Sequence, residues 1–468
     1  IQSSLTANLY GQAGTDAFNF FNTAVLTGLI DGMGDADSLS FAGASSAVSV
    51  TLTGVGATDG LNGGSSQVTG GFSNIDMLAG SALNGDSLTG MNVAAVFDFD
   101  TVNTYNYLGQ SLELIGFEAL NGGTSTDTFR FQDGATFTGT LNGGAGSDTL
   151  DLSNYLSGRA VALTAIGTTD GFQGTLDVLT GSFNNINILI GSGAAGDSLT
   201  GMNATAEFDF AATTTYNAGG RTLTFSAVED LIGNAGADTF DFADGVSFAG
   251  SLDGQGGADV LDFANYTTAR NVILTAFGTV DGFQGTEASI GGGFDNIDAM
   301  VGGSSTTDTL TGMDTPNAWA INGSNAYTSG LNSFGYSAVE RLQGGSDVDV
   351  FTITGTRSIN LFGGAGDDQF IFNIGAVLNG TLDGETGSDT LDFSPFATGR
   401  TINLTGADAD GFAGTANNIN GSFDGIDSLL GSLSASTDTI VAPEATDTTF
   451  NIDSSLSVTI GVYTLPFT

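Results

Sequence analysis

Nine aspartates follow glycine-rich stretches at recurring positions, as three pairs and one triplet. The pairs are Asp16 with Asp37, Asp127 with Asp148 and Asp238 with Asp259, and the triplet is Asp349, Asp368 and Asp389. Glycine stands five residues before every one of them, which indicates a backbone path that a side chain would obstruct. Because Ca²⁺ prefers carboxylate and carbonyl oxygens, the loops are candidate cation sites. The alternative is a plain turn whose aspartate binds local backbone amides.

The candidate ligands are the loop glycines together with the aspartate that follows them. They are Gly11, Gly14 and Asp16; Gly32 and Asp37; Gly122 and Asp127; Gly143, Gly144, Gly146 and Asp148; Gly233, Gly236 and Asp238; Gly254, Gly257 and Asp259; Gly344 and Asp349; Gly363, Gly364, Gly366 and Asp368; and Gly384, Gly387 and Asp389. Two carboxylates stacked about 4.8 Å apart would repel by about 1 kcal/mol even in bulk water. A cation between them would reverse that repulsion.

The loops resemble the nonapeptide GGxGxDxUx of RTX β-rolls, a family of secreted bacterial calcium-binding repeats. GGAGSDTLD at 143–151 and GGAGDDQFI at 363–371 match it throughout, whereas GQAGTDAFN, GNAGADTFD and GETGSDTLD each lack one glycine. The resemblance implies Ca²⁺ held by loop carbonyls and aspartates between successive turns, within each pair and along the triplet. Unlike tandem RTX modules, the chain has one recognisable loop per turn, in separated groups. Calcium is therefore expected to act as a local clamp.

A long repeat organises the chain. GMN at 90–92 returns at 201–203 and, as GMD, at 312–314. This spacing predicts units 1–111, 112–222, 223–333 and 334–463, with a tail at 464–468. The fourth unit is longer by about 19 residues, roughly one extra coil, and a chain that absorbs such a segment and resumes its register is typical of a solenoid. These units resemble repeats of very large bacterial surface and extracellular proteins.

Alternating side chains predict short strands. In TFRF, Phe129 and Phe131 share one face and Arg130 the other, a period of two that is typical of a strand with one buried face. No helical period of useful length occurs. We therefore predict that residues 1–468 form one continuous all-β parallel β-solenoid, a β-roll or β-helix of about 20-residue coils in four long repeats. About 23 coils would extend for about 110 Å.

Three other periodic features allow more than one interpretation. A looser loop ends at Asp86, Asp197, Asp308 and Asp438, and no metal is assigned to it. Glu118, Glu229 and Glu340 precede paired aspartates by nine residues, either as outward strand residues or as supplementary calcium ligands. Tyr105, Tyr216 and Tyr327 also recur with the repeat. They would suit a carbohydrate-binding row on a solenoid face.

Composition excludes several classes of function. The net charge is -44, with 51 acidic residues against 7 arginines and no lysine, histidine or cysteine. Such a surface repels nucleic acid and anionic lipid, and disulfides are impossible. Disorder is excluded because 40% of residues are hydrophobic and 34 are Phe. No apolar run reaches the roughly 18 residues of a membrane span. Without His or Lys, and with no polar cluster peculiar to one unit, an enzyme is not expected.

The two ends of the sequence suggest self-association. Neither IQSSLTANLY nor SLSVTIGVYTLPFT resembles the polar cap of a solenoid, and the second is an apolar, strand-forming edge. We therefore expect an extracellular or cell-surface structural protein whose copies stack head to tail, the last coil of one on the first coil of the next, into a filament or matrix layer. The alternative is a fragment or stalk of a large RTX-like adhesin that binds a cell surface or its polysaccharide.

Overall fold

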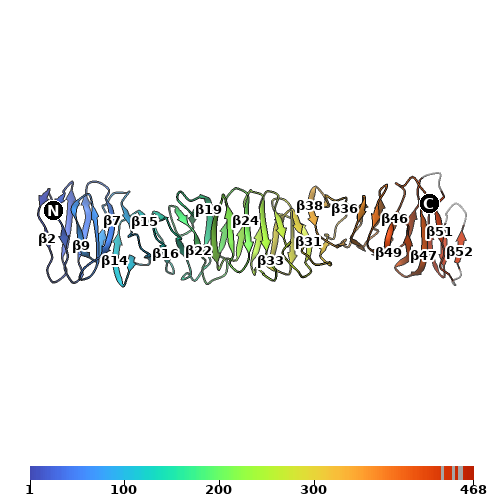
Figure 1. Ribbon diagram of the computed structural model, residues 1–468, viewed down its shortest axis with the longest axis horizontal. Coiled ribbons are helices and arrows are strands. Elements are labelled where there is room, and N and C mark those ends of the chain that lie inside the picture. Colours follow the sequence, from blue (N-terminus) through green and yellow to red (C-terminus); the bar gives the residue numbers. More distant parts are fainter. Residues whose placement is uncertain (434–436, 445–447, 452–456) are drawn as a thin grey trace. The chain divides into compact units, whose positions relative to one another are not determined.

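The computed structural model describes residues 1–433, 437–444, 448–451 and 457–468. Every helix or strand assigned in these residues is a strand, which confirms the all-β prediction. The described part of the chain contains no helix of the length and apolarity that crossing a membrane requires. Two compact units are formed, Ile1–Phe208 with Thr213–Asn234, and Asp209–Ala212 with Ala235–Thr468. Each unit is a stack of strands that cross it one after another (Figure 1).

Parallel pairing around the glycine loops builds the coils of the first unit. Strand β15 (Ala119–Gly123) pairs in parallel with β17 (Thr140–Gly144), and β16 (Thr128–Phe131) with β18 (Thr149–Asp151). The loop between β15 and β16 therefore lies directly on the loop between β17 and β18. The two loops are 21 residues apart along the chain. This register confirms the predicted β-solenoid with coils of about 20 residues at the paired loops.

Antiparallel meanders interrupt the parallel stack between the paired loops. In the first unit they include β7 (Ser49–Val55), β8 (Leu61–Ser65) and β9 (Val68–Ile75); β12 (Val96–Phe99), β13 (Asn103–Tyr107) and β14 (Gln110–Ile115); and β19 (Ala160–Ile166), β20 (Phe172–Leu176) and β21 (Phe183–Ile186). The outer strand β12 then pairs in parallel with β16, so the stack continues. Hydrogen-bonded loops beside these meanders are 32 or 39 residues apart along the chain rather than 21. The sequence did not predict the meanders, because parallel and antiparallel strands share the period of two.

The second unit repeats this plan and contains the extra coil. Its meanders include β47 (Thr401–Asp408), β48 (Gly411–Ala416) and β49 (Ile419–Ile426), nearer the C-terminus. The earlier ones are β31 (Asn271–Phe277), β32 (Phe283–Glu287) and β33 (Ile290–Ile297), and β36 (Asn317–Ile321), β37 (Ala326–Ser329) and β38 (Asn332–Ser337). Three successive parallel strands follow, β40 (Asp349–Ile353), β43 (Gln369–Phe372) and β46 (Thr390–Asp392). The extra segment of the fourth repeat is thus one added coil, as predicted. Asp349 and Asp368 are 19 residues apart along the chain and are hydrogen-bonded to each other.

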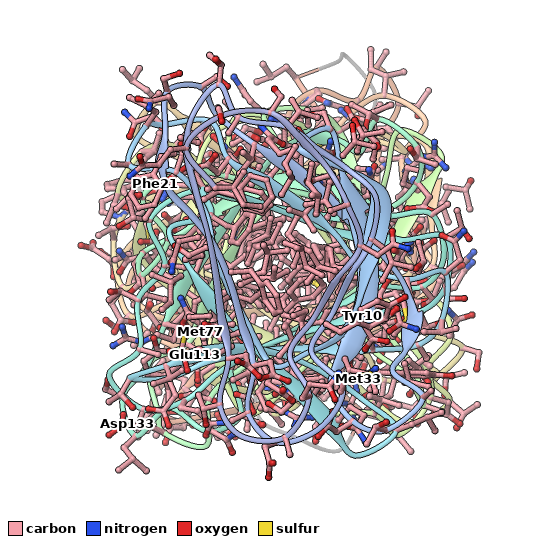
Figure 2. The ribbon with its side chains drawn as sticks, turned by 90° about the vertical axis from the view of Figure 1, so that its left-hand side faces the viewer. Tyr10, Phe21, Met33, Met77, Glu113 and Asp133 are labelled. Carbon is pink, nitrogen blue, oxygen red and sulfur yellow. The ribbon has the colours of Figure 1, made fainter. Side chains whose placement is uncertain are left out.

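Aromatic side chains stack through the interior. Phe129 and Phe131 in β16 are both 0% exposed, while the Arg130 side chain between them faces outward. Phe129 lies on Phe97 with ring centroids 5.0 Å apart, and Phe131 on Phe99 at 4.4 Å. The end view shows side chains filling the space that the first coils enclose (Figure 2). Because each coil places its apolar face on that of the next, the core is continuous within a unit.

The periodic tyrosines lie inside this core, so the prediction of a carbohydrate-binding row is wrong. Tyr105, Tyr216 and Tyr327 are each 0% exposed. Their hydroxyls accept hydrogen bonds from the backbone N–H groups of Met91, Met202 and Met313, at 3.0, 2.7 and 2.9 Å. A Cβ on Gly201 would lie 2.9 Å from the Tyr216 ring. The glycine of each recurring Gly-Met pair therefore leaves space for the ring of a buried tyrosine.

Removing one of these hydroxyls tests their structural role. We expect Tyr105→Phe to destabilise the protein by about 1–3 kcal/mol, because the buried Met91 N–H loses its acceptor. The measurement is the midpoint of urea unfolding. Tyr10→Phe is the control, since Tyr10 is 52% exposed and its substitution should change stability by less than about 0.5 kcal/mol. Equal midpoints for both variants would contradict the assignment.

The C-terminal segment differs from the open edge strand that the sequence predicted. Strands β52 (Thr448–Asn451), β53 (Ser457–Ile460) and β54 (Tyr463–Pro466) form a small antiparallel sheet instead of a further parallel coil. Among the described residues of this segment, Phe467 lies parallel to Leu429, and Thr468 is hydrogen-bonded to Leu429 and Gly431. A tight turn at Gly461, whose φ is 64°, reverses the chain between β53 and β54.

Candidate metal centre

The paired aspartates form a ladder along the stacked coils. The backbone N–H of Asp127 donates to Asp148 Oδ1 at 2.7 Å, and that of Asp148 donates to Asn187 Oδ1 at 3.1 Å. The other repeats have the same ladders, Asp16–Asp37–Asp76, Asp238–Asp259–Asp298 and Asp349–Asp368–Asp389–Asp427. The structure thus stacks the predicted loops. Each ladder also ends on a residue that was not predicted as a ligand. This residue is the last one of the recurring segments FSNID (72–76), FNNIN (183–187), FDNID (294–298) and FDGID (423–427).

One oxygen of most ladder carboxylates is buried without a hydrogen-bond partner. These atoms are the Oδ2 atoms of Asp16, Asp37, Asp127, Asp148, Asp259, Asp368 and Asp389. A buried carboxylate oxygen that lacks a partner is energetically costly. Burial, aided by the Asp148 charge, raises the pKa of Asp127 to about 7. Burial and the neighbouring carboxylates raise the pKa of Asp389 to about 8.

Asp349 is the exception in the triplet, because its Oδ2 accepts the Gly345 N–H at 2.8 Å. Burial still raises the pKa of Asp349, to about 6. The predicted run of three equivalent ligands along Asp349, Asp368 and Asp389 is therefore uneven. Its last two carboxylates keep an unpartnered oxygen, while the first uses both.

The two loop glycines serve different purposes. A Cβ on Gly143, five residues before Asp148, would lie 2.3 Å from Asp148 Oδ2 and 2.2 Å from the Asn185 carbonyl oxygen. This confirms that a side chain would obstruct the loop at that position. Gly146 and Gly257, two residues before their aspartates, have φ of 134° and 154°, which side chains disfavour. The first glycine supplies space beside the carboxylate, and the second supplies the turn.

In each looser loop, both carboxylate oxygens of the aspartate accept hydrogen bonds from backbone N–H groups. Asp86 is 0% exposed, yet its Oδ1 accepts the Val48 N–H at 2.6 Å and its Oδ2 accepts the Ser81 N–H at 2.8 Å. Equivalent pairs of backbone donors bind Asp197, Asp308 and Asp438. Because both oxygens already have donors, these loops have no need of a cation.

The periodic glutamates belong to the looser loops. Glu118 Oε2 accepts the backbone N–H of Asp86 at 2.9 Å. Glu229 and Glu340 do the same for Asp197 and Asp308, at 3.0 and 3.1 Å. Neither interpretation from the sequence described this role. The glutamates stand nine residues before the paired aspartates, but their partners lie 32 residues away along the chain, a relation that only the coil register creates.

Three carboxylates converge beside the ladder of the third repeat. One oxygen each of Asp259, Asp281 and Asp298 lies within 4.8 Å of the others, and this group could hold a metal ion. Asp281 comes from the recurring DGFQG turn. Its Oδ2 accepts the Gly257 N–H at 3.2 Å, while its Oδ1 is buried and unpartnered. Within the described residues, no other three acidic side chains approach one another this closely.

The chemistry available at these sites is that of hard oxygen ligands. Carboxylate oxygens with raised pKa values gain either from taking up a proton or from binding a cation. Nothing in the sequence alone joined Asp281 and Asp298 to the paired loops. Neither a protein-family model nor a curated protein sequence matches the chain, so its function must be argued from these residues.

Proposed function

We propose that the protein is an extracellular structural protein, a β-solenoid whose stacked coils are stabilised by bound calcium. The observation that carries the proposal is the set of buried, unpartnered carboxylate oxygens that recur in the stacked loops. Calcium suits them better than magnesium, because it accepts an irregular shell of six to eight carboxylate and carbonyl oxygens, whereas magnesium keeps several waters. Calcium is millimolar outside cells, where sites of this kind would be occupied.

The proposal assigns the protein no catalytic activity. The same carboxylates recur in successive repeats, as expected of groups that stabilise a repeating scaffold. A net charge of -44 in a folded chain would be self-repelling, and bound cations offset that repulsion.

Head-to-tail assembly is one use of such a scaffold. Within the described chain, β1 (Leu5–Thr6) and β2 (Leu9–Tyr10) are each paired on one side only. Strand β3 (Ala17–Asn22) pairs with β6 (Ser38–Ala44), and Ile1 also hydrogen-bonds its backbone at Asn19 and Phe21. Tyr10 and Phe21, which lie on opposite sides of the interior in the end view (Figure 2), are 52% and 41% exposed. Open strand edges with exposed apolar side chains pair readily with another chain.

A stalk within a larger surface protein, in which the chain carries an adhesin, is the second candidate. The antiparallel sheet β52–β54 favours it. Head-to-tail stacking pairs strands in parallel, whereas the described strands of this segment pair with one another in antiparallel fashion.

Electron microscopy of the purified protein separates these candidates. In millimolar calcium, self-assembly predicts filaments that lengthen with protein concentration and shorten in Phe21→Asp, but not in Leu156→Asp, which changes a 79% exposed residue away from the two end coils. Single particles of one length at all concentrations would instead support the stalk. An unchanged melting temperature between calcium and a chelator would overturn the proposed calcium clamp.

A further inference from the structure

The third carboxylate of the converging group exceeds what the ladder requires. In the second repeat, Asn187 accepts the Asp148 N–H through Oδ1 at 3.1 Å. In the third repeat, Asp298 accepts the Asp259 N–H through Oδ2 at 3.0 Å. An amide oxygen therefore completes the ladder as well as a carboxylate does. The second oxygen of Asp298 is available for another purpose.

Each member of the group uses one oxygen for a backbone N–H. Asp259 Oδ1 accepts from Asp238 at 2.7 Å, and Asp281 Oδ2 accepts from Gly257 at 3.2 Å. The remaining Asp259 Oδ2 and Asp281 Oδ1 are buried without partners. Asp259 is 0% exposed and points into the group, since one of its oxygens lies within 4.8 Å of an oxygen of Asp281 and of Asp298.

Three negative charges at this separation repel one another, by about 1 kcal/mol per pair in bulk water and more where water is excluded. No proton-donating side chain in this group relieves that repulsion, because all three members are carboxylates. Hard oxygens with one free lone-pair face each are the ligand set of a divalent cation such as Ca²⁺. The group therefore has both the chemistry and the electrostatic need for an ion.

We propose that Asp259, Asp281 and Asp298 bind a divalent cation, which lies between the paired loop and the DGFQG turn rather than between paired aspartates. Aspartates stand at the corresponding positions in the first repeat, Asp37, Asp59 and Asp76, and in the fourth, Asp389, Asp410 and Asp427, although their carboxylate oxygens are less closely grouped than those of the third. The second repeat has a weaker version, since Asn187 replaces the third carboxylate. The inference rests on the proposed function only for the identity of the ion.

The first repeat has several of the same hydrogen bonds and buried, unpartnered oxygens as the third. Asp37 is 1% exposed with Oδ2 unpartnered, and its N–H donates to Asp76 Oδ2 at 3.0 Å. Asp59 Oδ1 is buried and unpartnered, as Asp281 Oδ1 is. In the fourth repeat, Asp389 N–H donates to Asp427 Oδ2 at 3.0 Å. The second repeat retains an unpartnered Asp170 Oδ1, so only the third charge is missing.

Charge exchange between the two repeats tests the site. Calcium binding to the full chain is measured by equilibrium dialysis, with terbium luminescence as a second readout. Asn187→Asp should add one tight site, and Asp298→Asn should weaken one site about tenfold, since affinity follows the number of ligand charges. Asp100→Asn, at an exposed carboxylate, is the control and should change neither value.

The outcomes separate this inference from the proposed function. Calcium binding that is unaltered by both Asn187→Asp and Asp298→Asn overturns the inference but leaves a calcium clamp at the paired loops intact. If wild-type protein binds Mn²⁺ with the expected changes but no calcium, the inference holds and the proposed function fails. Asp298→Asn keeps the ladder acceptor, so its fold is expected to survive. Its unchanged circular dichroism would verify that the lost binding is local.

Discussion

In a chelator, the protein is expected to become less stable as the pH rises from about 4 to about 8, and millimolar calcium should remove most of this dependence. Burial is the main cause, because it raises the pKa of Asp127, Asp259 and Asp368 from 3.8 to about 7 and that of Asp389 to about 8. The folded state then binds protons that the unfolded state has released. The stability that these groups contribute is complete below the unfolded pKa and is lost as the pH rises through the folded values.

Calcium changes this dependence because it binds the deprotonated carboxylates. Binding should release protons near pH 7, which is measurable as a dependence of the binding enthalpy on the ionisation enthalpy of the buffer. The main measurement is the melting temperature between pH 4 and pH 9, with calcium and with chelator. Parallel curves under the two conditions would contradict the prediction.

Asp368→Asn gives a sharper form of the same test. Asparagine can still accept the Asp349 N–H, which Asp368 Oδ1 accepts at 2.7 Å, but it has no charge to bury. In chelator at pH 8, the variant is expected to melt above the wild type. In millimolar calcium the order should reverse, because a ligand has been lost. A variant less stable under both conditions would mean that the carboxylate is structural only.

Gly143→Ala is expected to be strongly destabilising. The new Cβ would lie 2.2 Å from the Asn185 carbonyl oxygen and 2.3 Å from Asp148 Oδ2. The Asn185 oxygen belongs to the backbone and Asp148 Cβ would also lie only 2.6 Å away, so the coil stack must separate locally. We expect a loss of about 3 kcal/mol in stability, and a loss of calcium affinity from the same repeat.

The matched control is Gly193→Ala, where an added Cβ meets nothing within 4 Å. It should leave both the melting temperature and the bound calcium unchanged. Denaturant midpoints and dialysis measure the two quantities. If Gly143→Ala binds and melts as the wild type does, the close approach of Gly143 to Asp148 is not required. The recurring glycine would then need another cause.

Local patterns predicted the strands and the loops. Alternation at Phe129 and Phe131 predicted a strand with one buried face, and both residues are buried. The glycine five residues before each aspartate predicted a crowded backbone, and Gly143 is crowded. The extra segment before Asp368 predicted one added coil, which is present. These features depend on residues that lie within about one coil of each other along the chain. They can therefore be recognised in the sequence alone.

Other features depend on which coil lies on which, and the sequence alone does not give that. The same period of two describes the parallel strand β16 and the antiparallel strand β13, so the meanders were invisible. Tyr216 stands among polar residues and looked like a surface residue, yet the space beside Gly201 places it in the core. The period of the side chains shows which residues share a face, but not which strand packs against that face.

The sequence by itself determined an acidic, all-β repeat whose loops stack aspartates on aspartates. Only the tertiary structure decided what those aspartates contact, since Asp281 and Asp298 reach Asp259 from turns far along the chain. It also showed that backbone N–H groups occupy one carboxylate oxygen and leave another buried and unpartnered, as at Asp148. Hydrogen bonds between coils follow from register. Register is set by how the coils pack, and spacing along the chain does not specify it.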